Sequence, residues 1–380
     1  MRGFATDYAR THTPLRPVHP GHPTYARCPP VSGPLDDRGR LRVRGFDPTD
    51  AAAARDTEGD GDTETTPATS TDRWRRAWDR FRRDRVAVAG LAVIGVLALL
   101  AVLARPVEVG GVVVQPVALA PYDPAASGVA ESYLPPSPTH PFGTDWAGRD
   151  VFSRVLYGGR YSLSIGGIAV ALALAVGVPL GALAGYVGGW VDEAIMRLVD
   201  VLYAFPFLVL AIALVATFGQ GFWKLVGALV AVGWIGYARL LRGEVLSVVE
   251  REYVLAARAL GVTDRRILVR HVVPNAVAPV VVQATLNVGT VVLSAAALGF
   301  LGLGLPPGTA EWGSMLSAGR DTLVGGEWWV TVFPGLAIFL FVLSINLVGD
   351  GVRLALDPDA GADTYRGRGG ARRDDREAER

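Results

Sequence analysis

The chain has 380 residues, half of them hydrophobic, and its 37 Lys and Arg residues almost balance its 36 Asp and Glu residues. A nucleic-acid-binding protein would carry a clear basic excess, so this balance excludes nucleic acid as a partner. The single cysteine, Cys28, excludes an internal disulfide framework and any zinc site made of clustered cysteines. Because the apolar residues are concentrated in long segments, the composition favours a membrane protein over a soluble enzyme.

Residues 1–72 have the composition of a disordered cytoplasmic tail. Pro, Arg and His are frequent up to residue 50, and 55–72 consists mainly of Asp, Glu, Thr and Gly. Neither part shows apolar periodicity, so burial cannot offset the entropy of ordering the chain. The sequence near Met1 lacks the apolar segment of a signal peptide, so we expect none. His12, His19, His22 and Cys28 are scattered and lack the spacing of a metal site. N-terminal sequencing of the mature protein would show whether it retains this tail.

Six apolar segments follow a basic stretch over 73–85, whose arginines and tryptophans are typical of an interfacial anchor. Five of the six approach or exceed the roughly 20 residues needed to cross a bilayer, and the sixth is close to that length. We therefore expect an all-α fold, a polytopic membrane protein with one transmembrane domain over 86–357 and a disordered, charged tail over 358–380. The expected spans are 86–104, 162–187, 198–218, 222–238, 277–303 and 330–348.

The distribution of arginine indicates how these spans are oriented. The 304–329 loop carries only Arg320, whereas 239–275 is rich in arginine and the C-terminal tail adds Arg353 and others. The long 105–160 segment also carries arginines, but long translocated segments count for little in the positive-inside rule. We expect a multi-pass protein of the cell membrane with both termini and the 239–275 segment in the cytoplasm. The arginines of that segment are Arg239, Arg242, Arg251, Arg258, Arg265, Arg266 and Arg270.

The spans contain almost no ionisable side chain. Asp200 and Lys224 lie within about a turn of span ends, where they can reach the interface. Transporters coupled to protons or ions need titratable or coordinating groups near the midplane, and nucleotide hydrolysis needs a phosphate-binding loop of the Gly-x-x-x-x-Gly-Lys-Ser/Thr type, which the chain lacks. We expect no enzyme activity and no cofactor on this chain, so another subunit must supply the energy.

Residues 252–274 form a polar, Arg-rich segment between two apolar ones. Residues 252–260 favour an amphipathic helix with Val254, Leu255, Ala257 and Leu260 largely to one side, and Gly261 suits the left-handed position at its end. Thr263 or Asp264 then caps a second helix over 265–273, and Pro274 bars its simple continuation. Small residues at 256, 257 and 259 would let the first helix dock in a groove of a partner. The residues alone equally allow an interfacial helix whose arginines lie on anionic lipid headgroups.

Three blocks of the sequence resemble one family. They are 140–160, beginning His-Pro-Phe-Gly-Thr-Asp; the Ala-Ala-x-x-x-Gly core within 252–275, followed by Pro274; and 298–315, with further matches at 334–338 and 346–353. Together they are similar to the dipeptide, oligopeptide and nickel branch of binding-protein-dependent ABC permeases, whose fold is that of type I importers. The second block resembles the family's "EAA" loop, although Leu255 stands where the family often has Glu; Glu252, one turn earlier, has a carboxylate on roughly the same face.

The resemblance implies a transmembrane permease subunit that imports di- or oligopeptides and catalyses no bond chemistry. It implies a second permease chain, two ABC ATPase domains that bind the ATP, an extracytoplasmic solute-binding protein and the lipid bilayer as partners. It also implies an ATPase-coupling loop over 242–275. The residues matched to that loop's contacts are Glu252, Ala256, Ala257, Gly261, Asp264 and Pro274. Nickel or another small solute is an alternative cargo, and a stand-alone channel or secondary transporter is an alternative of another class.

Two further features have structural interpretations. The charged block at 144–150 could dock a binding protein, but glycines and paired charges favour a compact turn that braces the first two spans. The glycine-rich 299–307 segment follows a span and ends in two prolines, so we expect a span terminus and a turn instead of a dinucleotide site. The glycines and prolines inside the spans, among them Gly177, Gly181 and Pro206, favour ordinary helix packing over functional kinks.

Overall fold

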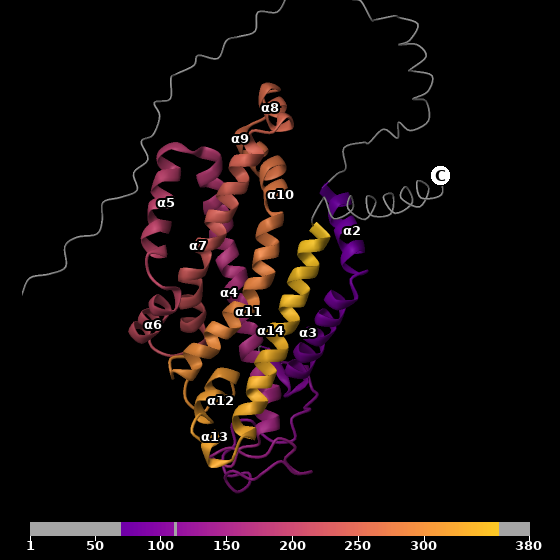
Figure 1. Ribbon diagram of the computed structural model, residues 1–380, viewed down its shortest axis with the longest axis vertical. Helices are drawn as coiled ribbons and strands as arrows, with labels where there is room; N and C mark the ends of the chain where they lie inside the picture. Colours follow the sequence, from indigo (N-terminus) through magenta and orange to yellow (C-terminus); the bar gives the residue numbers. More distant parts are fainter. Residues whose placement is uncertain (1–69, 110–111, 357–380) are drawn as a thin grey trace, which may run out of the picture. The chain divides into compact units, whose positions relative to one another are not determined.

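The computed structural model describes residues 70–109 and 112–356, all of which belong to one compact unit, Ala68–Arg380. The expected disordered tails, 1–72 and 358–380, lie outside the described residues, except that 70–72 begin the helix α2 (Ser70–Phe81). The predicted all-α class is confirmed (Figure 1), apart from one small antiparallel pair of strands, β1 (Val107–Val109) and β2 (Val112–Gln115).

Among the described residues, five helices are long and apolar enough to cross a membrane. They are α3 (Arg85–Leu103), α4 (Val151–Val187), α7 (Phe222–Val249), α11 (Ala278–Phe300) and α14 (Trp329–Leu356). All five overlap expected spans, and several extend beyond them. The helix α4 begins at Val151 instead of 162 because Asp150 caps it, with its carboxylate accepting from the Ser153 backbone N–H at 2.8 Å.

The third expected span, 198–218, is not one straight helix. The chain instead forms α5 (Gly189–Tyr203) and α6 (Phe207–Phe218), which are bent by 86° relative to each other and count as a sixth span only as a bent pair. Pro206 stands at the break with a ψ of 127° and has no N–H to donate, so it ends one helix and starts the next. Residues 189–197, in the segment 188–197 where we expected a cytoplasmic loop, also belong to α5.

The helix α4 packs against α7 through a row of glycines. A Cβ atom at Gly177 would lie 2.6 Å from the carbonyl oxygen of Trp234, and one at Gly185 would lie 2.8 Å from that of Arg242. Gly181, between them, meets the backbone of Ala238 even more closely. Small residues four apart let two membrane helices approach backbone to backbone, which maximises van der Waals contact where lipid offers no hydrophobic driving force.

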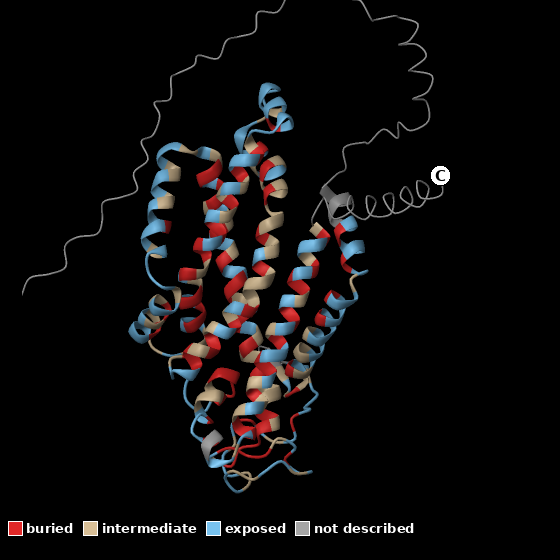
Figure 2. Cartoon of the chain, viewed as in Figure 1, coloured by how far each residue is buried: buried red, intermediate tan, exposed pale blue. Residues whose placement is uncertain are grey.

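The remaining helices surround this pair (Figures 1 and 2). The helix α14 lies between α3 and α11, and Gly90 of α3 meets the Ser344 carbonyl oxygen of α14 closely enough that a Cβ would lie at 2.8 Å. Only 17% of the apolar window of α3 is buried, against 56% for α7. The helix α3 therefore lies at the edge, where its apolar side chains suit lipid, and α7 lies at the centre.

The loops alternate between two ends of the helices, as the spans predicted. The end of α4, the start of α5, the helix α8 (Glu252–Ala259) and the end of α14 lie at one end in Figure 1. The 105–150 segment, α12 (Trp312–Ala318) and α13 (Thr322–Gly325) lie at the other end. The turn after α11 has Gly302 at a φ of +75°, which confirms a span terminus followed by a turn.

Candidate functional site

The helix α8 ends in a glycine motif that reverses the chain. Gly261 has a φ of +76°, its N–H donates to the Arg258 carbonyl oxygen at 3.0 Å, and the Val262 N–H donates to that of Ala257 at 3.2 Å. These are the two hydrogen bonds of a Schellman cap, so the predicted helix end at Gly261 is confirmed. The chain then enters α9 (Asp264–Ile267) with Thr263 at the N-cap position, although no side chain makes a capping bond there.

Buried apolar residues and two polar contacts fix this hairpin to the long helices. Val254 and Ile267 are fully buried in the core formed mainly with α4 and α7. The Tyr186 hydroxyl, at the end of α4, donates to the Asp264 carboxylate at 2.6 Å, and the Arg258 guanidinium lies 5.9 Å from the Tyr186 ring centroid. The hairpin is therefore in direct contact with the end of α4.

The outer face of α8 is exposed and partly apolar (Figure 2). Leu260 is 84% exposed, Leu255 is 49% exposed and Tyr253 is 42% exposed. The expectation that Val254, Leu255, Ala257 and Leu260 share one side is wrong, because Val254 points into the core and the two leucines lie about 100–120° of helix rotation away from it. Large exposed apolar side chains on a short protruding helix suit docking to another protein.

The predicted contact residues divide between this face and the interior. Glu252, Ala256, Gly261 and Asp264 are exposed, whereas Ala257 is half-buried. The exposure of Leu255 shows that the position where the family often has Glu points outward from the hairpin. The Glu252 carboxylate has no ion-pair partner within the described part of the chain.

The second helix of the hairpin does not stop before Pro274 as expected. It continues from α9 through a π-helical turn η1 (Leu268–Val272) into α10 (Val273–Ala276), which contains Pro274, and α11 follows after Val277. Pro274 has no N–H to donate to the preceding turn, and the wider π turn accommodates it without ending the helix. Pro274 is half-buried in this connection and joins the hairpin to α11 instead of adding to the exposed face of α8.

Two ion pairs join α5 to α7 near the hairpin. Arg242 donates to both carboxylate oxygens of Asp192 at 2.5 Å, and Arg239 donates to Asp200 at 2.6 Å. Arg239 also lies over the ring of Tyr203, 4.5 Å from its centroid. The carboxylate of Asp200, which we expected to reach the interface from a span end, is therefore paired with a residue of α7.

A cavity of about 420 Å³ lies between α4, the bend of α5 and α6, α7 and α11. Its lining is mainly apolar, but Tyr237, Asn287, Thr290 and Ser294 add neutral hydrogen-bonding groups. The Asn287 amide donates to the Tyr237 hydroxyl at 3.1 Å, and Gln283 donates to Asn287 at 2.9 Å. Sequence reasoning missed these residues, yet the polar positions 283, 287, 290 and 294 follow one face of a helix in an otherwise apolar span, which is a readable signal.

The 140–160 block braces the opposite end of the helices. Arg160 of α4 donates from Nε to the Ala101 carbonyl oxygen at the end of α3, at 2.7 Å. The His140 imidazole meets the buried Asp150 carboxylate at 2.9 Å, and the Trp329 indole donates to the Thr144 carbonyl oxygen at 3.1 Å. These contacts join the 140–160 block to the ends of α3 and α14.

Helices of this length, a neutral cavity among them and a protruding hairpin define a multi-pass membrane transport subunit. Residues 177–361 match the family described as "Binding-protein-dependent transport system inner membrane component", and residues 72–136 match the "N-terminal TM domain of oligopeptide transport permease C". The chain belongs to the first of these families, that of the inner membrane components of binding-protein-dependent transport systems. A member of this family is a transport subunit and is not itself an enzyme.

Similar proteins include two named for peptide transport. The dipeptide transport system permease protein DppC of Alkalihalophilus pseudofirmus is 42% identical over 293 residues, which are 76% of this chain and 91% of that protein. The glutathione transport system permease protein GsiD of Escherichia coli is 44% identical over 292 residues, 75% of this chain and 90% of that protein. A solved chain from inward-facing conformations of the MetNI methionine ABC transporter superposes with a TM-score of 0.45 at 20% identity, over 54% of this chain and 97% of the other.

Proposed function

We propose that this chain is a transmembrane subunit of an ABC importer that carries di- or oligopeptides across the cell membrane. The observation that carries the proposal is the α8 hairpin, which exposes Leu255 and Leu260 while Val254, Ile267 and the Tyr186–Asp264 bond hold it firmly to α4. The names of the similar proteins, which refer to dipeptides and to glutathione, support a peptide as the cargo.

The proposed assembly contains a second permease chain, two ATPase domains and an extracytoplasmic solute-binding protein. Separate subunits bind and hydrolyse the ATP, and this chain holds no cofactor. The exposed residues Glu252, Ala256 and Gly261 contact the ATPase, together with Ala257 and Asp264 at the edge of the same hairpin. In this arrangement both termini lie in the cytoplasm with α8, and the 140–160 block faces the outside.

The geometry supports transport by alternating access. When nucleotide closes the ATPase domains, a socket around α8 moves the hairpin, and two rigid connections transmit the movement. One runs from Asp264 through Tyr186 to α4, and the other runs through η1 and α10 to α11. Both helices line the 420 Å³ cavity, so their displacement changes which end of the cavity is open.

Substitution of Gly261 tests this function. A leucine there is strained by about 1–2 kcal/mol because of the left-handed backbone, and its side chain points into the space that the ATPase would occupy. We expect Gly261→Leu to abolish ATP-driven dialanine uptake by the reconstituted complex while the chain stays in the membrane. Gly95→Leu is the matched control, since Gly95 is exposed on α3, far from the coupling loop in sequence, and a Cβ there meets nothing within 4 Å.

The outcome separates the alternatives. If Gly261→Leu copurifies with the ATPase and transports normally, the coupling role of α8 is wrong. Dialanine flux through vesicles that contain only this chain would instead support a stand-alone channel or secondary transporter. Uptake of Ni²⁺ without uptake of dialanine would assign the same machinery to a metal cargo.

A further inference from the structure

A second pocket, of about 330 Å³, lies at the end of the molecule opposite α8. The segment before α4, the turns that follow α6 and α11, and the helix α12 enclose it. The residues that line it and carry the argument are Trp146, Arg149, Arg154, Gln220, Thr309 and Ser317. No step of the proposed transport cycle uses this pocket.

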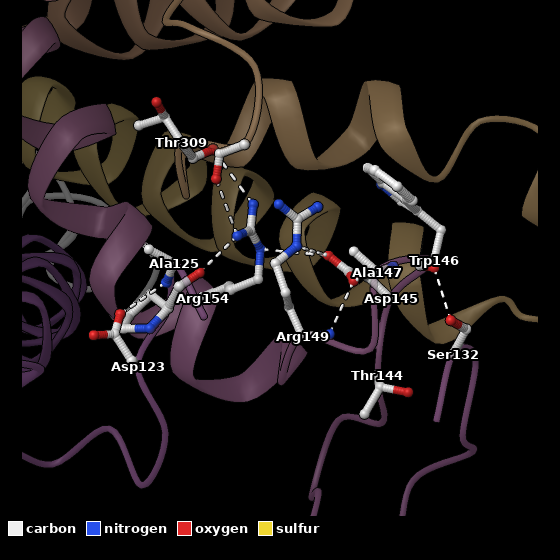
Figure 3. Close-up of polar contacts among 12 residues, drawn as sticks. Asp123, Ala125, Ser132, Thr144, Asp145, Trp146, Ala147, Arg149, Arg154 and Thr309 are labelled. Carbon is white, nitrogen blue, oxygen red and sulfur yellow. Dashed lines mark hydrogen bonds and ion pairs between the residues drawn. The ribbon is translucent and has the colours of Figure 1, made fainter. Parts of the chain in front are cut away.

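The charges beside this pocket are unequal. The Asp145 carboxylate accepts from Nε of Arg149 at 2.8 Å and lies 3.7 Å from Nε of Arg154, so one carboxylate serves two guanidinium groups (Figure 3). Both arginines are buried, with exposed fractions of 6% and 3%. The buried Glu311 carboxylate caps α12 by accepting from the backbone N–H groups of Gly313 and Ser314, and within the described residues no ion pair joins it to either arginine. The Asp145 cluster itself therefore holds two cations and one carboxylate.

The two guanidinium groups differ in how far the protein satisfies them. Arg154 donates from Nη1 to the carbonyl oxygens of Pro124 at 2.7 Å and Gly308 at 3.2 Å, and from Nη2 to that of Thr309 at 3.4 Å. Arg149 donates only through Nε, and within the described residues its two Nη groups have no acceptor. Figure 3 shows these Nη atoms pointing away from Asp145. The Arg149 side chain as a whole is largely buried, but its residue lines the open pocket, so an acceptor that enters the pocket can reach the Nη donors.

We propose that this pocket binds the free carboxylate of a small peptide on its way into the transporter. The planar fork of an arginine matches a carboxylate, which can accept from both Nη groups at once. The pocket volume suits a small ligand, and Trp146, whose ring centroid lies 5.2 Å from the Arg149 guanidinium, forms one wall. Because Arg149 is only 6% exposed, a flat protein surface cannot reach its guanidinium group. This favours a small molecule as the ligand.

The position of the pocket fits a peptide that enters the cavity. Gln220, in the loop between α6 and α7, donates to the Gly302 carbonyl oxygen after α11 at 2.6 Å, and both residues line the pocket. The helices α7 and α11 also line the 420 Å³ cavity. A carboxylate held at Arg149 therefore lies at the outer end of the helices that form the proposed pathway. This inference rests on the proposed function in peptide import.

Binding of dialanine and of its C-terminal amide to the assembled complex in nanodiscs, without ATP, tests the proposal. We expect dialanine to bind saturably and to change the fluorescence of Trp146, seen as a difference from Trp146→Phe, and we expect the amide not to bind. Arg149→Gln weakens dialanine binding about tenfold or more, as expected for the loss of hydrogen bonds to a charged group. Ser317→Asp, which leaves the Asp145–Arg149 pair intact, weakens it similarly by charge repulsion. Arg320→Gln, at an exposed cation of the same end, binds as the unaltered protein does.

Other results overturn the proposal. Equal binding of dialanine and its amide, or unaltered dialanine binding in both Arg149→Gln and Ser317→Asp, excludes a carboxylate site. If these variants lose docking of the solute-binding protein but bind dialanine normally, the carboxylate comes from that protein and not from the peptide. If only this inference fails, ATP-driven dialanine uptake by the unaltered complex persists, whereas failure of the proposed function removes that uptake.

Discussion

At the scale of single residues, the bond between Tyr186 and Asp264 stiffens the connection between the α8 hairpin and α4. It is short, at 2.6 Å, and joins the end of α4 to the first residue of α9. The carboxylate acceptor makes it stronger than a bond between neutral groups, although water reaches it. Ile267 and Val254 hold the hairpin in place by burial, so this bond adds stiffness to a contact that forms without it.

We therefore expect Tyr186→Phe to loosen coupling without preventing assembly. Loss of the bond costs about 1 kcal/mol, and the measured quantity is the number of ATP molecules hydrolysed per dialanine transported, which rises. Asp264→Ala removes the same bond, so the double variant is expected to be no worse than the single ones. Additive losses in the double variant would mean that the two side chains act separately.

Residues whose environment is local were predicted from the sequence, and residues placed by tertiary packing were not. Gly261 was identified because a helix end needs a left-handed residue whatever surrounds it. The outward positions of Leu255 and Leu260 depend on which residue of α8 meets the core, and that residue is Val254. Pro274 was expected to stop a helix, but the π turn before it removes the conflict that the expectation assumed.

At the scale of elements, the glycine row of α4 sets its distance from α7. Backbone atoms of α7 lie where a Cβ atom would stand at each of Gly177, Gly181 and Gly185. Overpacking such a contact costs about 1–3 kcal/mol, and the rigid carbonyl groups of α7 cannot move aside as a side chain can. The spacing of these glycines was visible in the sequence, but their partner helix was not.

Gly181→Val is expected to separate α4 from α7 and destabilise the chain. The lower thermal denaturation temperature of the detergent-solubilised complex measures this loss. Gly167→Val is the matched control, because Gly167 lies in the same helix and a Cβ there meets nothing within 4 Å. Equal denaturation temperatures for the two variants would show that the close approach at Gly181 does not limit stability.

The bent pair α5 and α6 shows what hydropathy cannot detect. The apolar run over 198–218 has the length of a span, and length is all that a hydropathy window measures. The break depends on Pro206, which the sequence shows, and on the Asp192–Arg242 and Asp200–Arg239 pairs, which hold α5 against α7 and depend on the fold. The sequence favours ordinary packing for Pro206 because proline is common in membrane helices, and neither ion pair can be read from a local pattern.

At the scale of the whole molecule, the sequence predicted that the loops alternate between the two ends of the helices. It did not predict which residues contact one another in the brace, the 140–160 block together with the segments that it contacts. The brace joins residues far apart in the chain, such as Arg154 with Gly308 and Ser162 with Glu311 at 3.1 Å. The number of possible pairings at such separations is large, and composition does not choose among them. The sequence of the 140–160 block indicated a compact turn, and the structure shows which segments of the chain this block contacts.

The whole molecule also predicts how transport is energised. Residues 161–187 of α4, 225–238 of α7 and 278–300 of α11 contain no Asp, Glu, Lys, Arg or His, so the described walls of the cavity have no carboxylate, amine, guanidinium or imidazole that could bind an ion by charge. A neutral pathway that moves a zwitterionic dipeptide shifts no net charge through the membrane potential, which otherwise supplies about 2.3 kcal/mol per charge for each 100 mV.

We expect ATP-driven dialanine uptake by the reconstituted complex to be unchanged when a protonophore collapses an imposed proton gradient at constant ATP. The same vesicles without ATP should show no uptake under that gradient, because in the proposed function the work reaches α4 and α11 through the α8 hairpin. The rate of ATP hydrolysis, measured alongside, controls for damage to the vesicles. Uptake that falls with the gradient while hydrolysis continues would require a proton-carrying group in the pathway, either a tyrosine of this cavity such as Tyr237 or a group of the second permease chain.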